Sequence, residues 1–409
     1  MTTIVKGGLL IDGSGSDPLK DPVITIENGK IASVGSSTGG GGAVSGEIID
    51  VSGKTILPGL IDAHVHSTMG YLLQPDAATY DDVGFALLGA RNLQTLLAAG
   101  ITTIRDVGAQ NSVIFALKKM IQQKLVMGPR VIASGQIICS TIGHGTELPG
   151  SRLSIIADGE ENVRKTVREQ IAMGADFIKL SIPIREGLPG FENLIGFRQD
   201  ELDAIIGEAH RLKRKVAAHA VFPSNIKVAV ASGIDTLEHG WFLDPGSASV
   251  MAEKGIYWIP TASFTSPVYL RGQIKKLGPD NQVGVRITES LSLLEKCFET
   301  LKNGFARAVE AGVKIATGTD VLDFSICNAA DEAIFLTEFG YSSMQSIMAA
   351  TKVAAEVLDM SDQVGTVEKG KFADLLVVNG NPLTDIRCLK DVYMVMKGGE
   401  VAAPVSALQ

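Results

Sequence analysis

The alternation of short apolar runs with longer helical patterns over residues 57–358 limits most strongly how this chain can fold. It predicts eight strands, at Ile56–His66, Thr102–Val107, Val131–Ile138, Phe177–Ser181, Lys215–His219, Thr236–His239, Tyr257–Thr261 and Lys314–Thr319. Helical patterns such as Glu160–Met173 and Ser290–Glu310 lie between these runs, and several end at a glycine placed as a C-cap. Eight strand-then-helix units over roughly 300 residues are typical of an α/β fold, the (β/α)8 TIM barrel. An open doubly wound sheet is the alternative.

The two ends of the chain show a different pattern, in which short β-rich runs are cut by turn residues. The pair Asn28-Gly29 between two such runs is a strong hairpin signal. The C-terminal runs would be unpaired strands by themselves, so we expect them to join the N-terminal runs. We therefore predict that residues 1–56 and 359–409 form a small composite β-sandwich domain, and that residues 57–358 form a barrel inserted into it.

Charge and cysteine content exclude several classes of protein. The net charge of −8 argues against a nucleic-acid or anionic-lipid partner and favours a small-molecule substrate. Four cysteines lie far apart, which indicates reduced thiols rather than a disulfide framework. No signal-peptide pattern occupies residues 1–12, and no apolar run reaches the roughly 18 residues of a membrane span. We expect a cytoplasmic protein that does not bind a membrane.

Most of the histidines lie at or near the ends of predicted strands. His64 and His66 are two residues apart on one strand, so their side chains leave from the same face and can bind one metal ion. A polar pair on a solvent face is the alternative, although so apolar a strand has no obvious solvent face. His219, His239 and Asp320 end three further strands. Because barrel sites collect at the carboxyl ends of strands, these imidazoles and this carboxylate together suit zinc.

Lys179 lies inside a predicted strand that is otherwise apolar. Burying an ammonium group is costly unless the group is paired or loses its charge. One interpretation is a salt bridge with Asp176 or another acid. The other is that the neutral amine has reacted with carbon dioxide, so that the carbamate binds metal as a carboxylate does. Residue type alone favours the salt bridge.

Three motifs carry a resemblance to a known family. They are Gly7-Gly8-Leu9-Leu10-Ile11-Asp12-Gly13, Pro58-Gly59-Leu60-Ile61-Asp62-Ala63-His64-Val65-His66 and Gly370-Lys371-Phe372-Ala373-Asp374-Leu375-Leu376-Val377. With these the chain resembles the amidohydrolase superfamily, in its branch of cytosolic prolidase-like dipeptidases and imidazolonepropionase-like hydrolases. The resemblance covers nearly the whole chain and implies a (β/α)8 barrel with a small β-sandwich.

The resemblance also implies a centre of two divalent metal ions, with zinc expected. His64 and His66 would bind the more buried ion with Asp320, His219 and His239 would bind the more exposed ion, and carboxylated Lys179 would bridge them. A metal-bridged hydroxide would attack the substrate carbonyl. Asp320 would act as general base and then as general acid toward the leaving nitrogen. The implied reaction is hydrolysis of an amide-like carbon–nitrogen bond.

Substrate contacts are predicted at two residues. His144 follows the third predicted strand between two glycines, and in this branch it resembles a substrate-binding residue that Arg152 would accompany. Dipeptidase relatives commonly carry a tyrosine just after the ligand at the position of His219, whereas this chain has Ala220-Val221-Phe222. With Trp241, Phe242 and Phe264 near other strand ends, the sequence suits a less polar amide, anilide, urea or lactam.

Three other functions are weighed against this one. A dipeptidase or carboxypeptidase acting on N-acyl amino acids shares the same metal centre. A mononuclear deaminase of the superfamily would need an acid soon after His219, and none follows within several residues. A scaffold without activity would have lost ligands, whereas all six ligand positions are filled. Relatives often form multimers, so we expect a homo-oligomer.

Overall fold

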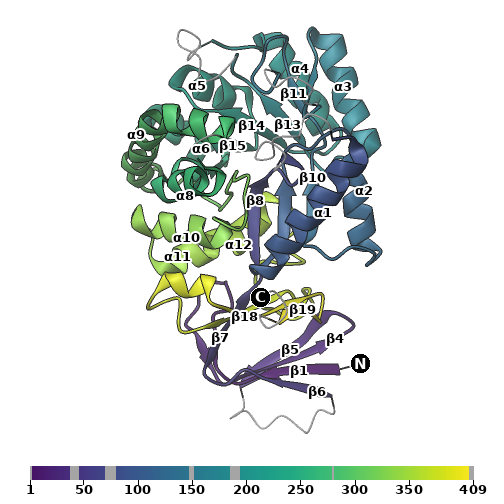
Figure 1. The fold of residues 1–409 in the computed structure, drawn as a ribbon, viewed down its shortest axis with the longest axis vertical. Coiled ribbons are helices and arrows are strands. Elements are labelled where there is room, and N and C mark those ends of the chain that lie inside the picture. The colour runs from purple at the N-terminus through teal and green to yellow at the C-terminus, as the bar shows by residue number, and fades with distance from the viewer. Residues whose placement is uncertain are drawn as a thin grey trace.

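The computed structural model describes residues 2–36, 46–69, 80–146, 152–184, 194–278 and 281–404. A larger helix-rich part surrounds β8 and β13–β15, and a smaller β-rich part lies at its lower end (Figure 1). Strands from both chain ends meet in the smaller part. None of the helices in the described ranges combines the length and the apolar composition that a bilayer crossing requires.

Two sheets make up the smaller part. One has the strand order β5-β4-β1-β6 and the other β19-β18-β17-β7-β2-β3, so strands of both chain ends pair in the second. The bounds are β1 Thr2–Lys6, β2 Leu9–Leu10, β3 Leu19–Lys20, β4 Pro22–Glu27, β5 Lys30–Ser36, β6 Glu47–Asp50, β7 Lys54–Pro58, β17 Leu375–Asn379, β18 Val392–Lys397 and β19 Glu400–Pro404. The two sheets share one apolar core, in which Ile24 and Ile26 of β4 pack with Ile56, Leu375 and Met396.

The larger part contains parallel strands in two hydrogen-bonded groups, ordered β10-β9-β8 and β12-β11-β13-β14-β15-β16. Their bounds are β8 Leu60–Val65, β9 Ile101–Asp106, β10 Arg130–Ala133, β11 Ile137–Cys139, β12 Ser154–Ile156, β13 Ile178–Ser181, β14 Val216–Ala220, β15 Thr236–His239 and β16 Tyr257–Ile259. Strands β8, β9, β13 and β15 are buried along their whole length. Parallel strands whose two faces are both covered, as in barrels and doubly wound sheets, have this all-buried pattern.

Helices follow most of these strands and cover them. They are α1 Asp82–Ala98, α2 Val113–Gln122, α3 Glu160–Met173, α4 Gln199–Arg211, α5 Pro223–Ser232, α6 Pro245–Lys254, α7 Ala262–Thr265, α8 Pro267–Leu277, α9 Gln282–Glu310, α10 Ala329–Glu338, α11 Ser343–Ala349, α12 Lys352–Val357 and the 3-10 helix η3 Ile386–Lys390. Helix α9 is longer than the predicted 290–310, because its amphipathic pattern continues to lower numbers. One large apolar core joins the helices to the parallel strands.

Two predicted strands are each divided in the structure. The run Ile56–His66 was expected as one strand, but β7 pairs antiparallel with β17 and β8 pairs parallel with β9. The change occurs at Gly59, where an added Cβ would overlap the side chain of Thr102. The run Val131–Ile138 likewise divides into β10 and β11, with Gly135 between them at a φ of +77°. A backbone in the left-handed region cannot continue a strand.

The prediction of an eighth regular strand at Lys314–Thr319 is wrong. In the described chain this segment makes one isolated bridge, between Ile315 and Trp258. Its backbone nevertheless reaches both neighbours, because Trp258 N donates to Lys314 O at 2.9 Å and Ala63 N donates to Thr317 O at 2.9 Å. The segment then turns sharply, since Asp320 has a φ of +55°. It lies between β16 and β8 without forming a full ladder with either.

The close approach of this segment to β8 depends on Gly318. A Cβ at this position would lie 2.7 Å from His64 Cβ and 2.9 Å from His64 N. We expect Gly318→Ala to lower the free energy of unfolding by about 1–3 kcal/mol, the usual cost of overpacking. Urea unfolding of the metal-free protein measures it. Gly207→Ala in α4 is the matched control, because nothing lies within 4 Å of its Cβ position. An unchanged midpoint for Gly318→Ala would contradict the expectation.

Candidate metal centre

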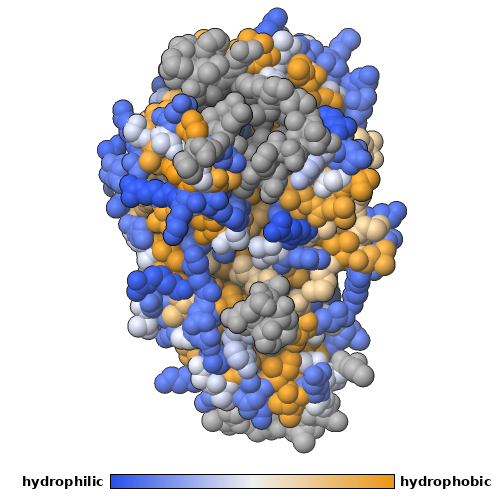
Figure 2. Space-filling model, viewed as in Figure 1, coloured by the Kyte–Doolittle hydropathy of each residue, from blue (hydrophilic) through white to orange (hydrophobic). Residues whose placement is uncertain are grey.

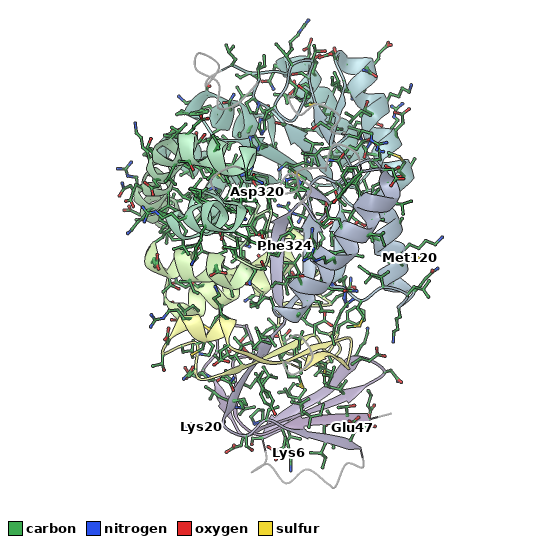
Figure 3. All side chains as sticks on the ribbon, in the orientation of Figure 1. Lys6, Lys20, Glu47, Met120, Asp320 and Phe324 are labelled. Atoms are coloured by element: carbon green, nitrogen blue, oxygen red, sulfur yellow. The ribbon has the colours of Figure 1, made fainter. Side chains whose placement is uncertain are left out.

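Asp320 lies among three buried imidazoles near the middle of the larger part (Figure 3). Its Oδ1 is 3.4 Å from His66 Nε2 and 3.6 Å from His64 Nε2, and its Oδ2 is 3.9 Å from His239 Nδ1. One candidate ligand atom from each of His64, His239 and Asp320 fits within a span of 4.8 Å. The residues come from β8, the end of β15 and the segment after Thr319, so the fold brings together groups 81–256 positions apart.

His219 and His144 extend the cluster. The ring of His219 lies 4.3 Å, centroid to centroid, from that of His239 and 4.7 Å from that of His144. His219 is on β14, next to β15, and His144 lies in the segment after β11. Both side chains are partly exposed, whereas His64, His66 and His239 are buried. The cluster therefore has a buried side and a more open side.

Lys179 on β13 is 2% exposed, and its Nζ has no hydrogen-bond partner among the described residues. The salt bridge with Asp176 considered above is wrong. The Asp176 carboxylate accepts two hydrogen bonds of 2.6 Å from Lys118 Nζ and one from Ala133 N. A fully buried amine without a partner is costly, so its environment favours a partner or a chemical change that removes its charge.

Burial shifts the pKa of each ionisable group in the cluster in the direction that favours its uncharged form. It holds the pKa of His64 and His239 well below the usual range and lowers that of His66 to about 3, with the Lys179 charge adding to the effect. Burial also raises the pKa of Asp320 to about 7 and lowers that of Lys179 to about 8. Neutral imidazoles have the free lone pairs that metal ions require. His64 Nε2 is such an atom, buried and without a hydrogen bond among the described groups.

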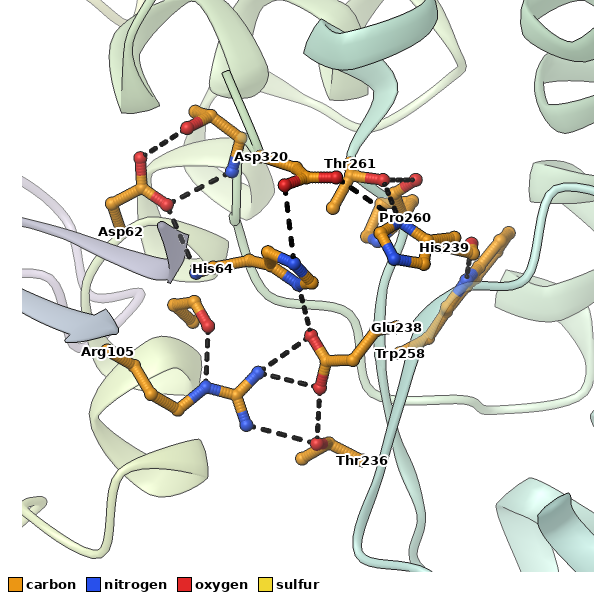
Figure 4. Close-up of polar contacts among 12 residues, drawn as sticks. Asp62, His64, Arg105, Thr236, Glu238, His239, Trp258, Pro260, Thr261 and Asp320 are labelled. Atoms are coloured by element: carbon orange, nitrogen blue, oxygen red, sulfur yellow. Dashed lines mark hydrogen bonds and ion pairs between the residues drawn. The ribbon is translucent and has the colours of Figure 1, made fainter. Parts of the chain in front are cut away.

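Each of the three buried imidazoles is held through its Nδ1. His66 Nδ1 is 2.8 Å from Gly108 O, His239 Nδ1 is 2.9 Å from Thr261 Oγ1, and His64 Nδ1 is 2.6 Å from a carboxylate oxygen of Glu238 (Figure 4). A bonded second nitrogen fixes the ring orientation of a metal-binding histidine. With the orphaned Lys179 Nζ, this donor set fits a metal centre.

Glu238 and Arg105 are site residues that the sequence prediction missed. Both are buried, and Arg105 Nη2 donates to the two Glu238 oxygens at 2.7 and 2.9 Å. A usable signal was present, since each is a charged residue inside a buried strand, β9 or β15. Such residues are rarely buried unless they are paired. The two residues are 133 positions apart, and a single sequence does not show that they pair with each other.

Three residues at the cluster have a strained backbone. His239, Thr261 and Asp320 have φ values of +67°, +50° and +55°, in the left-handed region that non-glycine residues seldom adopt. The turn before Asp320 is held by Asp62, whose carboxylate accepts from Thr319 N at 3.0 Å and from Thr319 Oγ1 at 2.7 Å. Strained residues of this kind persist where surrounding contacts fix them, often at functional sites.

The two predicted substrate residues differ in position. His144 stacks on His219, at the more open side of the cluster. The structure does not bring Arg152 into contact with the histidines within the described ranges. Its Nη2 lies 3.4 Å from Asp82 Oδ1, and both side chains are about half exposed. His210 bonds Asp235 at 2.8 Å, outside the cluster.

Aromatic side chains lie beside the cluster, as the strand-end residues suggested. The ring of Trp241 is 5.6 Å from that of His239 and stacks at 6.1 Å on Phe264, and Phe222 stacks at 5.3 Å on Phe242. Trp241 is fixed by a hydrogen bond of 3.0 Å from its Nε1 to Pro260 O. A cleft of about 1070 Å³ elsewhere, lined by residues such as Phe177, Phe372 and Lys397, contains none of the six predicted ligands.

A family model, curated proteins and solved structures all match this chain over most of its length. Residues 55–402 match a family described as the amidohydrolase family. The ochratoxinase of Aspergillus niger is 30% identical, over 98% of this chain and 86% of that protein. The imidazolonepropionase of Rhizobium rhizogenes is 25% identical, over 90% and 88%. A crystal structure of a Xaa-Pro dipeptidase with bound methionine superposes with a TM-score of 0.84 at 29% identity, covering 98% of this chain and 99% of that one. The family prediction is confirmed, and the fold is α/β and TIM-barrel-like.

Proposed function

Because this chain belongs to the amidohydrolase family and is a hydrolase of carbon–nitrogen bonds, we propose that it cleaves an amide-like bond of a small molecule at a centre of two divalent metal ions. The convergence of His64, His239 and Asp320 within 4.8 Å supports this proposal most strongly. The buried Nζ of Lys179, which has no hydrogen bond within the described part of the chain, supports it independently.

The proposed ligands divide between the two sides of the cluster. His64, His66 and Asp320 would hold the more buried ion, His219 and His239 would hold the more exposed ion, and Lys179 as a carbamate would contribute an oxygen to each. We expect zinc, because imidazole and carboxylate donors suit it. When bound, the two cations would polarise a carbonyl and lower the pKa of water.

The chain's own groups handle the protons and the charge. A carboxylate oxygen of Asp320 would accept the proton of the attacking water and return it to the leaving nitrogen, so one residue serves as base and then acid. Lys179 would react as the neutral amine, forming an N–C bond to carbon dioxide with loss of a proton. Burial, which lowers the pKa of Lys179 to about 8, favours that neutral form.

The architecture that goes with this proposal is one closed barrel inserted into a β-sandwich. Hydrogen bonds from β16 to Lys314 and from β8 to Thr317 support closure at one seam. At the other seam, Asp176 N donates to Ala133 O at 2.8 Å. We propose a sandwich of residues 1–56 and 359–409 and a barrel of residues 57–358. Gly59, just after β7 ends at Pro58, is the physical joint between them.

For the substrate, we propose an amide with an apolar or aromatic group. The stacked pair Trp241 and Phe264 beside His239 offers a flat apolar surface for such a group. The relatives named ochratoxinase and imidazolonepropionase make an aryl amide or a cyclic amide reasonable choices. The similarity to a Xaa-Pro dipeptidase favours a second candidate, a dipeptide or N-acyl amino acid. Against it, this chain has Ala220-Val221-Phe222 just after His219, where dipeptidase relatives commonly carry a tyrosine.

A panel assay tests the proposal. The metal-loaded enzyme is incubated with aryl amides, cyclic amides, ureas, dipeptides and N-acyl amino acids, and metal content is measured on the same protein. We expect close to two metal equivalents per chain and turnover of aryl or cyclic amides. Turnover of dipeptides alone would select the second candidate. One equivalent or less, with hydrolysis intact, would contradict the two-metal centre.

The aromatic surface makes a separate prediction. Trp241→Ala should raise KM for an aryl amide about 10-fold or more while changing KM for an aliphatic amide little, because stacking area is lost. Steady-state kinetics on both substrates measure this difference. Tyr393→Ala is the matched control, since Tyr393 is an exposed aromatic of β18. Equal losses for both substrates would contradict the assignment.

Two further predictions concern the surroundings of the enzyme. We propose a homo-oligomer, with a contact face at α1, where Val83 and Leu87 are 65% and 69% exposed one turn apart. Figure 2 shows apolar surface over this region. Cytoplasmic location stays a prediction from the sequence, whose four cysteines lie far apart along the chain.

A further inference from the structure

We propose that Glu238, held in place by Arg105, is a positioning residue that sets the tautomer of His64. In this role its carboxylate keeps the hydrogen of the imidazole on Nδ1 and leaves the lone pair of Nε2 directed at Asp320. The effect on metal affinity rests on the proposed function, but the tautomer itself does not, because it is a property of the metal-free protein.

The contact between Glu238 and His64 is short and buried, so it restricts the orientation of both side chains. Their atoms Oε2 and Nδ1 are 2.6 Å apart, and the two side chains are 0% and 1% exposed. An ionised carboxylate can only accept a hydrogen bond, so the imidazole nitrogen that faces it must donate. The opposite nitrogen, Nε2, then carries the lone pair, and it lies 3.6 Å from Asp320 Oδ1.

Arg105 fixes the orientation of Glu238. Its Nη2 donates to both carboxylate oxygens, and its Nη1 donates to Thr236 Oγ1 at 3.0 Å. Thr236 Oγ1 in turn lies 2.5 Å from Glu238 Oε1. Glu238 Oε1 therefore accepts from two donors, and Oε2 faces His64 (Figure 4). A fully paired, buried carboxylate of this kind keeps its rotamer.

The network also joins three strands. Arg105 is on β9, Glu238 on β15 and His64 on β8, and Arg105 Nε donates to the carbonyl of Ala63 at 2.5 Å. The guanidinium group thus holds the backbone one residue before His64 and, through Glu238, the ring of His64. Among the three buried imidazoles of the cluster, His64 is the one whose Nδ1 is within hydrogen-bond distance of a carboxylate, at 2.6 Å. Those of His66 and His239 face a carbonyl and a hydroxyl.

Glu238→Gln provides a sharp test. Both carboxylate oxygens of Glu238 accept from Arg105 Nη2, and Oε1 accepts in addition from Thr236 Oγ1. With the amide oxygen of the glutamine at the Oε1 place both Oε1 bonds are kept, and the amide NH2 group then lies against His64 Nδ1. That nitrogen would have to accept, so the hydrogen would move to Nε2 and remove the lone pair from the centre. Long-range 15N–1H NMR of the ring nitrogens reads this directly in metal-free protein, since the chain has six histidines. The signals of His64 are assigned with His64→Gln.

In the wild type we expect His64 as the Nδ1–H tautomer, and in Glu238→Gln as the Nε2–H tautomer. Zinc affinity, measured by chelator competition, should fall about 10- to 100-fold in Glu238→Gln. Glu201→Gln is the matched control, because Glu201 is a buried glutamate of α4 outside the cluster. Glu201→Gln should leave both the tautomer of His64 and the zinc affinity unchanged. A variant that only disturbed the structure would not move the ring hydrogen of His64 from Nδ1 to Nε2.

The outcomes separate this inference from the proposed function. An Nε2–H tautomer of His64 in the wild type, which needs no variant to fold, would overturn the inference. So would an Nδ1–H tautomer in Glu238→Gln with unchanged zinc affinity. If the wild type bound no zinc but the tautomer still changed in Glu238→Gln, the proposed metal centre would fail and the positioning role of Glu238 would stand.

Discussion

Asp320→Asn should keep most of its metal and lose turnover by a factor of about 10²–10⁴, the usual contribution of a general base or acid. The amide oxygen of asparagine can still coordinate a metal ion, but it cannot take and return a proton. The side chain is nearly isosteric, and the turn before it is held by the Asp62–Thr319 bonds, so the fold should be retained. Metal analysis and kcat on a substrate found in the panel assay measure the two effects.

Asp323→Asn is the control for this change. Asp323 is three residues further along the same segment, and its carboxylate bonds Ser325 and Lys276 rather than the imidazoles. It should retain near-normal kcat. Near-normal turnover of Asp320→Asn would exclude Asp320 as the base, and complete loss of metal would show that its main role is as a ligand.

Lys179→Met should lower the metal content from about two equivalents toward one and abolish most activity. Methionine fills a similar buried volume without an amine, so no carbamate can form and the bridging oxygens are lost. Because the Nζ of Lys179 has no hydrogen bond among the described groups, its removal should not lower the free energy of unfolding of the metal-free protein. Metal analysis, kcat and urea unfolding measure the three effects together.

Bicarbonate dependence distinguishes the carbamate from a simple amine. Wild-type protein stripped of metal and carbon dioxide should regain activity with zinc only when bicarbonate is added, and Lys179→Met should regain none in either case. Lys215→Met is the matched control, since Lys215 precedes β14 and bonds Asp359 at 2.6 Å. Full activity of Lys179→Met, or wild-type recovery independent of bicarbonate, would contradict the carbamate.

Much of the site was predictable because its residues are tied to local pattern. His64 and His66 share a strand face through the two-residue period of a strand. His219 and His239 are at or near the ends of β14 and β15, where parallel strands bring side chains to one edge. The prediction of secondary structure failed where the local sequence pattern indicates one structure and the tertiary contacts impose another. Segment 314–319 reads as a strand, but the close approach at Gly318 and the turn at Asp320 replace its ladder with single hydrogen bonds.

The sequence by itself determined the alternation of strands and helices, the family, and the histidine and aspartate candidates for metal ligands, because these follow from residue type, spacing and motif. The candidate role of Lys179 as a ligand came from the resemblance to the family. Only the tertiary structure decided which groups meet. The fold pairs Arg105 with Glu238, which lies 133 positions further along the chain. It also pairs Asp176 with Lys118, and the Nζ of Lys179 has no hydrogen-bond partner among the described residues. The physical reason is that the partner of a buried charge depends on which strands become neighbours, and one sequence records the charges but not that adjacency.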